Sequence, residues 1–369
     1  MSEMASRAGP CGIFTGYPAP AVFWTPPRKG RISRAMTRGL TIGDVTVPGR
    51  VLTAPMTGIT DLPFRQTAAD LGAAYVATEM VASAELAKGR PDVVRRAAVG
   101  DGLGLTVIQL VGARPDMMAE GARMAERAGA DIVDLNFGCP AKEVTGIASG
   151  SALLRDLDRA CAILEAVIGA TGRPVTLKTR LGWDHDSLNA AELARQAQQI
   201  GVKAVTVHGR TRQQFYSEAA DWDAVRRVRD AVDIPVIVNG DIDNAERARE
   251  AMSRSGCDAV MLGRAVQGRP WMASAIERGL DGEAFREPDL HERLDIVMQH
   301  FRRSLTFYGE RLGLKMFRKH LGWYVEGAPY HPDPQVRRGD KARLCRLESP
   351  AAVEESLAEL WCTRKARAA

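Results

Sequence analysis

The chain is 369 residues long, with 45% hydrophobic and 26% charged residues, which is typical of a soluble globular protein with one large domain and a smaller one. No apolar run approaches the roughly 20 residues that a membrane helix needs. The six cysteines are far apart, without a CxxC pair or a histidine cluster at ligand spacing, which argues against a disulfide framework and a structural zinc site. We therefore expect a cytoplasmic protein with no metal and no membrane contact.

The net charge of +5 arises within residues 1–40, which carry six basic residues and one acidic residue. This stretch also holds five prolines and no periodic apolar pattern, so we predict a disordered extension. Its Arg-rich composition is similar to that of a targeting peptide, but it lacks an apolar core followed by a cleavage site. The alternative is a gene start assigned too far upstream, with Met36 as the true first residue.

From residue 51 the sequence alternates short apolar, β-branched runs with amphipathic stretches of helical spacing. Runs that are apolar throughout are typical of parallel strands buried on both faces. Eight such units within about 230 residues predict a (β/α)8 TIM barrel spanning residues 41–284. An open doubly wound sheet is the alternative, but the nearest glycine cluster, GDGLGL at 100–105, precedes a strand, whereas a dinucleotide loop would follow one. The predicted strands cover residues 51–56, 75–80, 105–110, 132–137, 174–180, 204–210, 235–241 and 259–265, and the clearest helices cover 116–128, 187–200 and 244–255.

Polar side chains follow the apolar body of each predicted strand, and in a barrel all eight carboxyl ends meet at one rim, where active sites lie. Asn239, Gly240 and Asp241 follow the seventh strand. Gly263 and Arg264 follow the eighth, and barrels commonly hold a phosphate at these two ends. Glycine lets backbone N–H groups approach the phosphate, and Arg264 can donate two parallel hydrogen bonds to it. Phosphate-binding aldolase and isomerase barrels would share this part of the pattern.

Three further polar residues suit the rest of a phosphorylated ring cofactor. His208, on the sixth strand, can reach the same phosphate. Lys178 and Gln109, on the fifth and third strands, would face the polar edge of a ring, and a lysine there would stabilise negative charge on a reduced flavin. The rim therefore favours FMN over a dinucleotide.

After residue 284 the pattern is helical, with amphipathic stretches at 294–308 and 314–324, and we predict a small helical domain over residues 285–369. Residues 302–346 carry eleven Lys or Arg and four Asp or Glu, an excess that favours an anionic partner such as nucleic acid. A solvated helix face is the alternative interpretation.

Nine motifs occur in order along the predicted barrel: APMTGITDLPFR (54–65), TEM (78–80), VIQLVG (107–112), LNFGCPAK (135–142), GSALL (150–154), TLKTRLGW (176–183), VHGRTR (207–212), VIVNGDI (236–242) and MLGRAVQGRPW (261–271). With KHLGWY (319–324) in the helical part, they make the chain resemble the tRNA-dihydrouridine synthases from about residue 51 to 325. The resemblance is strongest to the bacterial B-type, NifR3-like branch.

The resemblance implies an enzyme that reduces the C5=C6 bond of specific uridines in tRNA to 5,6-dihydrouridine, with FMN recharged by NADPH or NADH. We expect it to act as a monomer. The implied flavin contacts are Pro55, Met56, Thr57, Gln109, Lys178, His208, Asn239, Gly240, Asp241, Gly263 and Arg264. The implied tRNA contacts on the barrel are Asn136, Arg180, Arg210 and Arg212.

The resemblance also implies that Cys139 is the catalytic acid. Hydride delivery to C6 of uracil builds negative charge at C5 and O4, so a proton must reach C5. A thiol with an ordinary pKa of about 8.5 is protonated at neutral pH and still acidic enough to donate. Gly138 and Pro140 would shape the short loop that presents it. The alternative is a small buried apolar residue, which we expect of Cys161 and Cys257 on their helical stretches.

A base in folded RNA is stacked and must be extruded before it can react, so the enzyme needs a second surface that grips the RNA. The basic segment is the candidate, and phosphate contacts there would make binding salt-dependent. The predicted contacts are Arg302, Arg303, Lys315, Arg318, Lys319, Arg337 and Arg338.

The loop after the cysteine departs from the pattern of the resemblance. Glu143 replaces a usual lysine, Phe137 a usual methionine and Ser149 a usual alanine, and residues 145–149 carry no charge. Neither the RNA contacts of this loop nor the selected uridine therefore follows from the resemblance. Two other functions remain open: a flavin oxidoreductase for a free pyrimidine, of the dihydroorotate type, and an RNA-binding protein that folds or chaperones tRNA.

Overall fold

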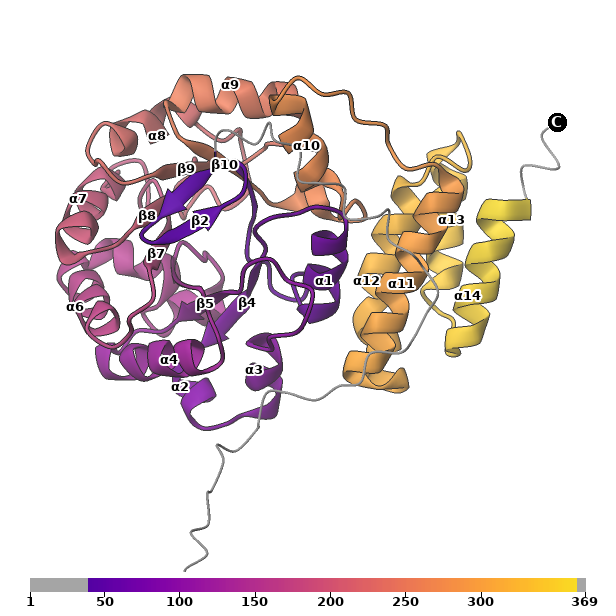
Figure 1. The fold of residues 1–369 in the computed structure, drawn as a ribbon, viewed down its shortest axis with the longest axis horizontal. Helices are drawn as coiled ribbons and strands as arrows, with labels where there is room; N and C mark the ends of the chain where they lie inside the picture. Colours follow the sequence, from indigo (N-terminus) through magenta and orange to yellow (C-terminus); the bar gives the residue numbers. More distant parts are fainter. Residues whose placement is uncertain (1–38, 364–369) are drawn as a thin grey trace, which may run out of the picture.

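The computed structural model describes residues 39–363. The predicted extension, residues 1–40, lies outside the described residues except for its last two. Figure 1 shows a ring of parallel strands surrounded by helices, with a group of further helices at one side.

Eight parallel strands form a barrel in the order β3-β10-β9-β8-β7-β6-β5-β4. An isolated parallel bridge between Thr53 and Val76 joins the two edges of the sheet and closes the cylinder. The predicted TIM barrel is therefore confirmed. Its strands are β3 (Val51–Thr53), β4 (Ala77–Ala82), β5 (Val107–Val111), β6 (Ile132–Phe137), β7 (Val175–Arg180), β8 (Ala204–His208), β9 (Val236–Asn239) and β10 (Ala259–Leu262).

Several strands end earlier than predicted, because the backbone turns where the polar rim residues begin. The N–H of Arg210 donates to the carbonyl of His208 at 2.7 Å, a tight turn that takes Arg210 out of β8. Asp241 has a left-handed φ of +55°, which cannot continue β9. Beyond β10 the chain enters a 3-10 turn, η2 (Arg264–Val266).

An unpredicted hairpin covers the amino-terminal end of the barrel. β1 (Leu40–Ile42) and β2 (Val45–Val47) pair antiparallel. The turn between them includes Gly43, which has a φ of +62°. The apolar side chains of the hairpin join one hydrophobic cluster with the first residues of several strands, among them Ala77, Val107, Ile132, Ala204 and Ala259.

Helices alternate with the strands and surround the barrel (Figure 1). Cys161 lies on one of these helices as predicted but is only half-buried, less than expected, whereas Cys257 lies just after a helix that ends at Ser255 and is buried. The prediction that Cys257 is helical is thus wrong, although its burial is as expected. The helices are α1 (Leu62–Asp70), α2 (Ser83–Ala87), α3 (Pro91–Arg96), α4 (Pro115–Arg127), α5 (Lys142–Thr145), η1 (Gly150–Arg155), α6 (Leu157–Ile168), α7 (Ala190–Ile200), α8 (Trp222–Arg229), α9 (Ala245–Ser255) and α10 (Met272–Leu280).

The C-terminal region is helical, as predicted, and lies beside the barrel (Figure 1). Phe64 of α1 shares a hydrophobic core with Phe301 and Phe317 of this region. Among residues 39–363, no helix is long and apolar enough to cross a membrane. The C-terminal helices are α11 (Leu290–Tyr308), α12 (Glu310–Gly327), α13 (Pro334–Leu344) and α14 (Pro350–Ala358), followed by a π-helical turn, η3 (Glu359–Thr363).

Candidate active site

The ladder register brings the predicted site residues to one rim. Asn136 of β6 pairs with Lys178 of β7. Arg180 of β7 pairs with His208 of β8, which pairs in turn with Asn239 of β9. The cysteine loop follows β6 directly, so Cys139 lies at the same end of the barrel as the lysine and the imidazole.

A chain of hydrogen bonds inside the barrel runs to the backbone of Cys139. Gln109 Nε2 and Thr176 Oγ1 each donate to the carboxylate of Asp134 at 2.6 Å. Asn136 Nδ2 donates to Gln109 Oε1 at 2.8 Å. Asn136 Oδ1 accepts from the N–H of Cys139, also at 2.8 Å. The contacts observed for Asn136 and Gln109 therefore orient the cysteine loop. The contact of Asn136 with RNA and that of Gln109 with the flavin stay predictions.

Asp134 is a residue of this site that the sequence analysis missed. It lies two residues before Asn136, so both side chains point to the same face of β6. A charged residue inside an otherwise apolar strand, at this spacing from Asn136, was the available signal. Burial raises the pKa of its carboxyl to about 6, against the hydrogen bonds from Thr176 and Gln109 and the charge of Lys178, which lower it.

The cysteine loop is held from two sides. Ser151 donates to the carbonyl of Cys139 from its N–H at 3.1 Å and from its hydroxyl at 2.9 Å. Arg180 Nε donates to the carbonyl of Gly138 at 2.9 Å. Gly150 has a φ of +57°, and a Cβ there would lie 2.8 Å from the carbonyl oxygen of Cys139. The GSALL motif therefore supports the loop that carries the thiol.

The thiol of Cys139 is half-buried. Burial raises its pKa above the ordinary value, against a hydrogen bond from Ala141 and the positive charges of Arg180 and Lys178. The thiol is therefore protonated at neutral pH.

Lys178 Nζ donates to Asn239 Oδ1 at 3.1 Å, and burial, with the charge of Arg180, lowers the pKa of its ammonium to about 8. Lys178 thus remains mostly charged at neutral pH.

Four cations surround His208 at the end of β8. Burial lowers the pKa of its imidazole well below the ordinary value, and the charges of Arg180, Lys178, Arg210 and Arg264 lower it further. Arg210 Nη1 lies 3.1 Å from His208 Nε2. Because a guanidinium only donates, Nε2 must accept, and the neutral ring carries its proton on Nδ1. This concentration of positive charge suits an anionic group such as a phosphate.

Asp241 binds two of these arginines. Its Oδ2 accepts from Arg210 Nη2 at 2.5 Å, and its Oδ1 accepts from Arg264 Nη2 at 3.0 Å. The side chain of Arg264 is 58% exposed, whereas that of Arg210 is 2% exposed. Arg264 is therefore the one of the two that a ligand at the rim can reach from solvent.

At these strand ends Gly263 leaves open space, whereas Gly240 packs closely against His208. A Cβ on Gly263 would meet no atom of the described chain within 4 Å. Gly240 has a φ of +118°, and a Cβ there would lie 2.9 Å from His208 Cδ2, so no larger residue fits. With Lys178, His208 and Arg264 alongside, these residues fit an anionic ring cofactor such as FMN.

Pro55, Met56 and Thr57 lie on the loop that follows β3, at the same rim. Thr57 is exposed, and the other two are half-buried. Glu79, a buried residue near the middle of β4, accepts the N–H of Gly58 at 2.5 Å and so anchors this loop.

Two arginines predicted to contact RNA are buried, with 2% exposure each. Arg180 Nη1 donates to the carbonyls of Thr211 and Phe215 at 2.8 Å. Arg210 Nη2 donates to the carbonyl of Glu218 at 2.7 Å. Both therefore shape the loop after β8, and RNA could contact their guanidinium groups only after these bonds are rearranged. Arg212, which is half-buried, lies over the ring of Trp183 at 4.8 Å.

Three of the seven predicted tRNA contacts of the helical region lie on α12. Lys315 and Lys319 are exposed, and no hydrogen bond or ion pair within residues 39–363 involves either ammonium. The side chain of Lys319 lies against Gly58, which brings α12 to the barrel rim. Arg318 is half-buried, with Nη2 3.5 Å from the carbonyl of Leu347. The other four candidates are engaged within the protein: Arg302 with Glu354, Arg303 with Asp70, Arg337 with backbone carbonyls, and Arg338 with Glu326.

The four large apolar side chains that are exposed in the described chain all lie on loops at this rim. Ile147 is 66% exposed on the uncharged loop after Cys139, and Leu188 is 41% exposed after β7. Phe215 and Tyr216 are 46% and 49% exposed after β8. Nothing in the sequence distinguishes these four residues, because an apolar side chain on a loop belongs to no periodic pattern. Of the four, the ring of Tyr216 lies directly beside the cationic site, because Arg180 and Arg264 lie over it at 5.6 and 5.3 Å, and Phe215 packs edge-on against Tyr216.

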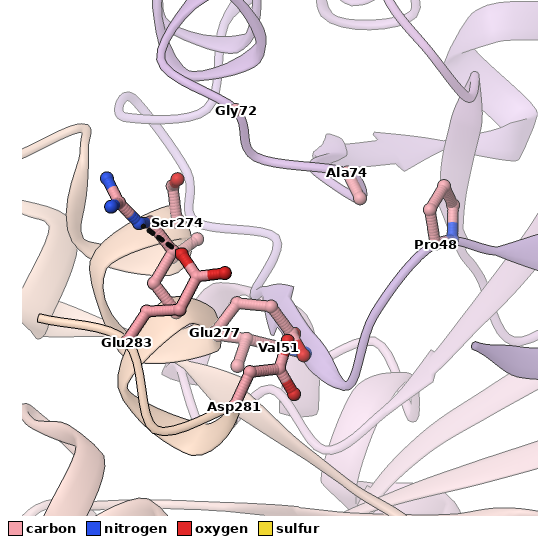
Figure 2. Close-up of a pocket in the computed structure, with 10 residues that line it drawn as sticks. Pro48, Val51, Gly72, Ala74, Ser274, Glu277, Asp281 and Glu283 are labelled. Atoms are coloured by element: carbon pink, nitrogen blue, oxygen red, sulfur yellow. Dashed lines mark hydrogen bonds and ion pairs between the residues drawn. The ribbon is translucent and has the colours of Figure 1, made fainter. Parts of the chain in front are cut away.

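A separate hollow of about 220 Å³ lies elsewhere, at the amino-terminal side of the barrel (Figure 2). Val51, the first residue of β3, lines it together with Glu277 and Asp281 from the end of α10 and the turn that follows. It contains none of the predicted site residues.

The sequence model of the family described as dihydrouridine synthase (Dus) matches residues 52–353. A protein of Rhodobacter capsulatus named probable tRNA-dihydrouridine synthase is 48% identical over 318 residues, which cover 86% of this chain and 96% of that protein. A protein of Pseudomonas aeruginosa named tRNA-dihydrouridine synthase B is 44% identical over 326 residues, which cover 88% and 96%.

Two solved structures share the fold at low identity. A 2-naphthoyl-CoA reductase aligns with a TM-score of 0.54 at 12% identity over 68% of this chain. A 6-hydroxypseudooxynicotine amine oxidase from Pseudomonas geniculata N1 aligns with a TM-score of 0.53 at 14% identity over 67% of this chain. The alignments cover only 52% and 50% of those proteins, and at this identity they show the fold alone.

Proposed function

The chain belongs to the dihydrouridine synthase family, and we propose that it reduces the C5=C6 bond of specific uridines in tRNA, with FMN as the bound cofactor and NADPH as the electron donor. Support comes above all from one observation: a protonated thiol and a cluster of four cations occupy the same barrel rim. The first suits a proton donor, and the second suits an anionic cofactor. The proposal includes a monomeric enzyme that acts in the cytoplasm.

FMN, when bound, would supply the hydride for C6 of the uracil. Its phosphate would bind at the ends of β9 and β10, where Arg264 and the neutral imidazole of His208 can donate hydrogen bonds. Lys178 would hold the polar edge of the ring with its ammonium. The remaining proposed contacts are Pro55, Met56, Thr57, Gln109, Asn239, Gly240, Asp241 and Gly263.

Cys139 would donate the proton to C5. Its raised pKa keeps the proton on the sulfur until charge develops on the base. Asn136 and Ser151 fix the backbone on both sides of the thiol, so the donor is already oriented. The thiolate left behind would be stabilised by the charges of Arg180 and Lys178, and the half-buried sulfur can regain a proton from solvent.

The substrate base must leave its stack to reach this rim. The exposed aromatic rings of Phe215 and Tyr216 would cover its apolar faces or those of its neighbours. Lys315 and Lys319 of α12 would bind phosphates of the tRNA body.

Substitution of the cysteine tests the proposal. Cys139→Ala should keep its FMN, measured by flavin absorbance, and should lose dihydrouridine formation on unmodified tRNA by at least about 100-fold, because general acid catalysis supplies that much. Cys161→Ala is the matched control, since Cys161 is also a half-buried free thiol but lies on α6.

Full activity of Cys139→Ala would contradict the acid assignment. Turnover of free uracil or orotate by the wild-type enzyme, without turnover of tRNA, would indicate a free-pyrimidine oxidoreductase instead. Full rescue of the cellular phenotype by Cys139→Ala would indicate an RNA chaperone.

A further inference from the structure

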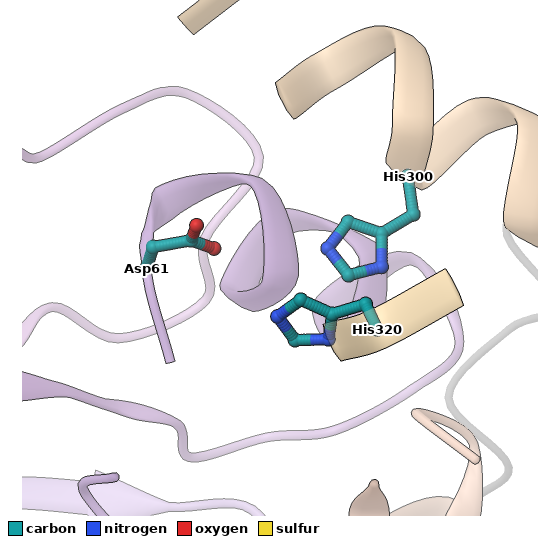
Figure 3. Close-up of side chains that lie close together, drawn as sticks. All are labelled: Asp61, His300 and His320. Atoms are coloured by element: carbon teal, nitrogen blue, oxygen red, sulfur yellow. The ribbon is translucent and has the colours of Figure 1, made fainter. Parts of the chain in front are cut away.

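Three buried side chains that can bind metal converge between the barrel and the helical region (Figure 3). Asp61 is the residue before α1, His300 lies on α11, and His320 lies on α12. Their ligand atoms all lie within 4.8 Å of one another. The three residues are far apart in the sequence, so no spacing pattern predicts that they form a cluster.

Both histidines offer an unused nitrogen to this space. His300 is 0% exposed and His320 is 2% exposed. In residues 39–363, neither Nε2 atom has a hydrogen-bond partner. Buried polar atoms without partners are rare, because each forfeits its hydration and gains nothing in return. Two such nitrogen atoms beside one carboxylate indicate a binding site for a cation.

We propose that Asp61, His300 and His320 form a binding site for one divalent transition-metal ion, of which Zn²⁺ fits best. Two imidazoles and a carboxylate are a common ligand set for zinc. The carboxylate supplies negative charge, and the neutral imidazoles supply two lone pairs. The fourth position would be taken by a water molecule.

The surroundings already hold these ligands in place. Asp61 Oδ1 accepts the N–H of Phe64, and its Oδ2 accepts the hydroxyl of Tyr308 at 3.0 Å. Each oxygen retains a lone pair for the metal. The hydroxyl of Tyr324 lies 3.0 Å from His300 Nδ1, so this ring can donate its Nδ1–H there while Nε2 binds the ion.

Metal binding requires a small contraction of the site. Tetrahedral ligands at about 2.0–2.1 Å from zinc lie about 3.4 Å apart, so the donor atoms must close by at most about 1.5 Å. The negative charge of Glu79 disfavours the ionised form of the Asp61 carboxyl group, and the positive charge of Arg65 favours it. Arg65 donates hydrogen bonds to the carbonyls of Thr60 and Ala98, and within the described residues it forms no ion pair with Asp61.

The ion would fasten two parts of the chain. One ligand belongs to the loop after β3, which carries Met56 and Thr57, and the other two belong to the helical region. Metal binding would therefore stabilise the docking of α11 and α12 against the barrel. This inference does not depend on the proposed reaction.

Metal content and thermal stability test the site. Tag-free, full-length wild-type protein is treated with chelator, incubated with ZnCl₂ or CoCl₂, freed of excess metal by gel filtration, and analysed by elemental mass spectrometry. We expect about one equivalent of metal per chain and a higher Tm than for the chelated protein, because a ligand that binds the folded state stabilises it. His300→Gln and His320→Gln should each retain less than about a tenth of that amount.

Two further variants separate this site from adventitious binding and from misfolding. His291→Gln removes an exposed histidine on the same helix as His300 and should retain the full equivalent. Asp61→Asn keeps an oxygen that can cap α1 but removes the charge, and it should fold and bind at least about 10-fold more weakly. The proposal is overturned if the wild-type protein retains no metal and shows no change in Tm. It is also overturned if Asp61→Asn binds as the wild type does, or if His291→Gln loses as much metal as His320→Gln.

Discussion

Asn136 joins the buried network of the barrel to the loop of the proposed acid, because its amide oxygen accepts the N–H groups of Gly138 and Cys139. Asn136→Ala should lower the rate of dihydrouridine formation by about 10- to 100-fold, since a misplaced donor loses orientation. It should also lower the free energy of unfolding by about 1–3 kcal/mol, because two N–H groups lose their acceptor. Single-turnover rates and urea unfolding measure the two effects.

Asn189→Ala is the control for this prediction. Asn189 Nδ2 donates to the carbonyl of Leu154 at 2.7 Å, so its removal also breaks an asparagine–backbone hydrogen bond. It should lower stability and leave the rate per flavin nearly unchanged. An equal loss of rate in the two variants would mean that Asn136 acts only through stability.

Asp134 makes a pH-dependent contribution to stability. Its pKa is about 6 in the folded protein and 3.8 when unperturbed, so the folded chain holds this proton more tightly than the unfolded chain does. Stability therefore falls as the pH rises from about 4 to about 6 and stays lowered above that range. Asp134→Asn lacks this term, so between pH 4.5 and 7 it should gain about 2 kcal/mol relative to the wild type. Urea unfolding at the two pH values measures the change, and a constant difference would contradict the assignment.

At the scale of single residues, the sequence predicted side chains whose position follows from strand order. Cys139, Lys178 and His208 were placed at one rim because the carboxyl ends of barrel strands meet there. The roles of Arg180 and Arg210 could not be predicted, since an arginine that binds RNA and one that turns inward to hold a loop look the same in a sequence. Asp134 was missed because its role depends on partners on β5 and β7.

At the scale of elements, Glu277 of α10 anchors the first barrel strand. One of its carboxylate oxygens accepts the N–H groups of Arg50 and Val51 at 2.6 and 2.8 Å. Figure 2 shows Glu277 beside Val51. Glu277→Ala should lower the free energy of unfolding by about 3 kcal/mol, because the N–H of a buried strand loses a charged acceptor. Chemical denaturation measures the loss.

The matched control is Glu283→Ala, from the lining of the same hollow. Glu283 pairs with Arg278 at 3.0 Å, and both side chains are about half exposed. An exposed pair of this kind contributes less than about 1 kcal/mol. Similar losses in the two variants would show that Glu277 acts as an ordinary surface charge.

The bodies of the barrel strands were predictable, because short apolar runs rich in β-branched residues are typical of strands buried on both faces. Their ends were not. The left-handed backbone of Asp241 and the tight turn at Arg210 are local events that no hydrophobic pattern encodes. The β1–β2 hairpin was missed because its strands have three residues each, too few to show a period.

At the scale of the whole molecule, the helical region docks through polar as well as apolar contacts. Arg303 of α11 pairs with Asp70 of α1 at 2.6 Å, and Tyr308 donates to Asp61. The local excess of basic residues predicted an anionic partner, yet much of that charge is engaged within the protein. The cluster of Asp61, His300 and His320 could not be predicted from the sequence either, because these residues meet only when the helical region docks against the barrel.

Lys315 and Lys319 of α12, whose ammonium groups form no ion pair in the described chain, give the last prediction. If tRNA phosphates bind there, the double variant Lys315→Ala/Lys319→Ala should weaken tRNA binding. It should also reduce the slope of log Kd against log salt concentration by about 2, because each phosphate contact releases about one counterion. Filter binding of unmodified tRNA to the enzyme over a range of KCl concentrations measures the slope.

Arg302→Ala/Arg338→Ala removes the same amount of charge from ion pairs with Glu354 and Glu326, and it is the control. Its slope should change by less than 1, since each arginine already has a carboxylate partner and releases no counterion from RNA. Equal changes in the two double variants would mean that tRNA responds to net charge alone. A smaller change in the control would locate the tRNA contact on the face of α12 where Lys319 lies against Gly58 at the barrel rim.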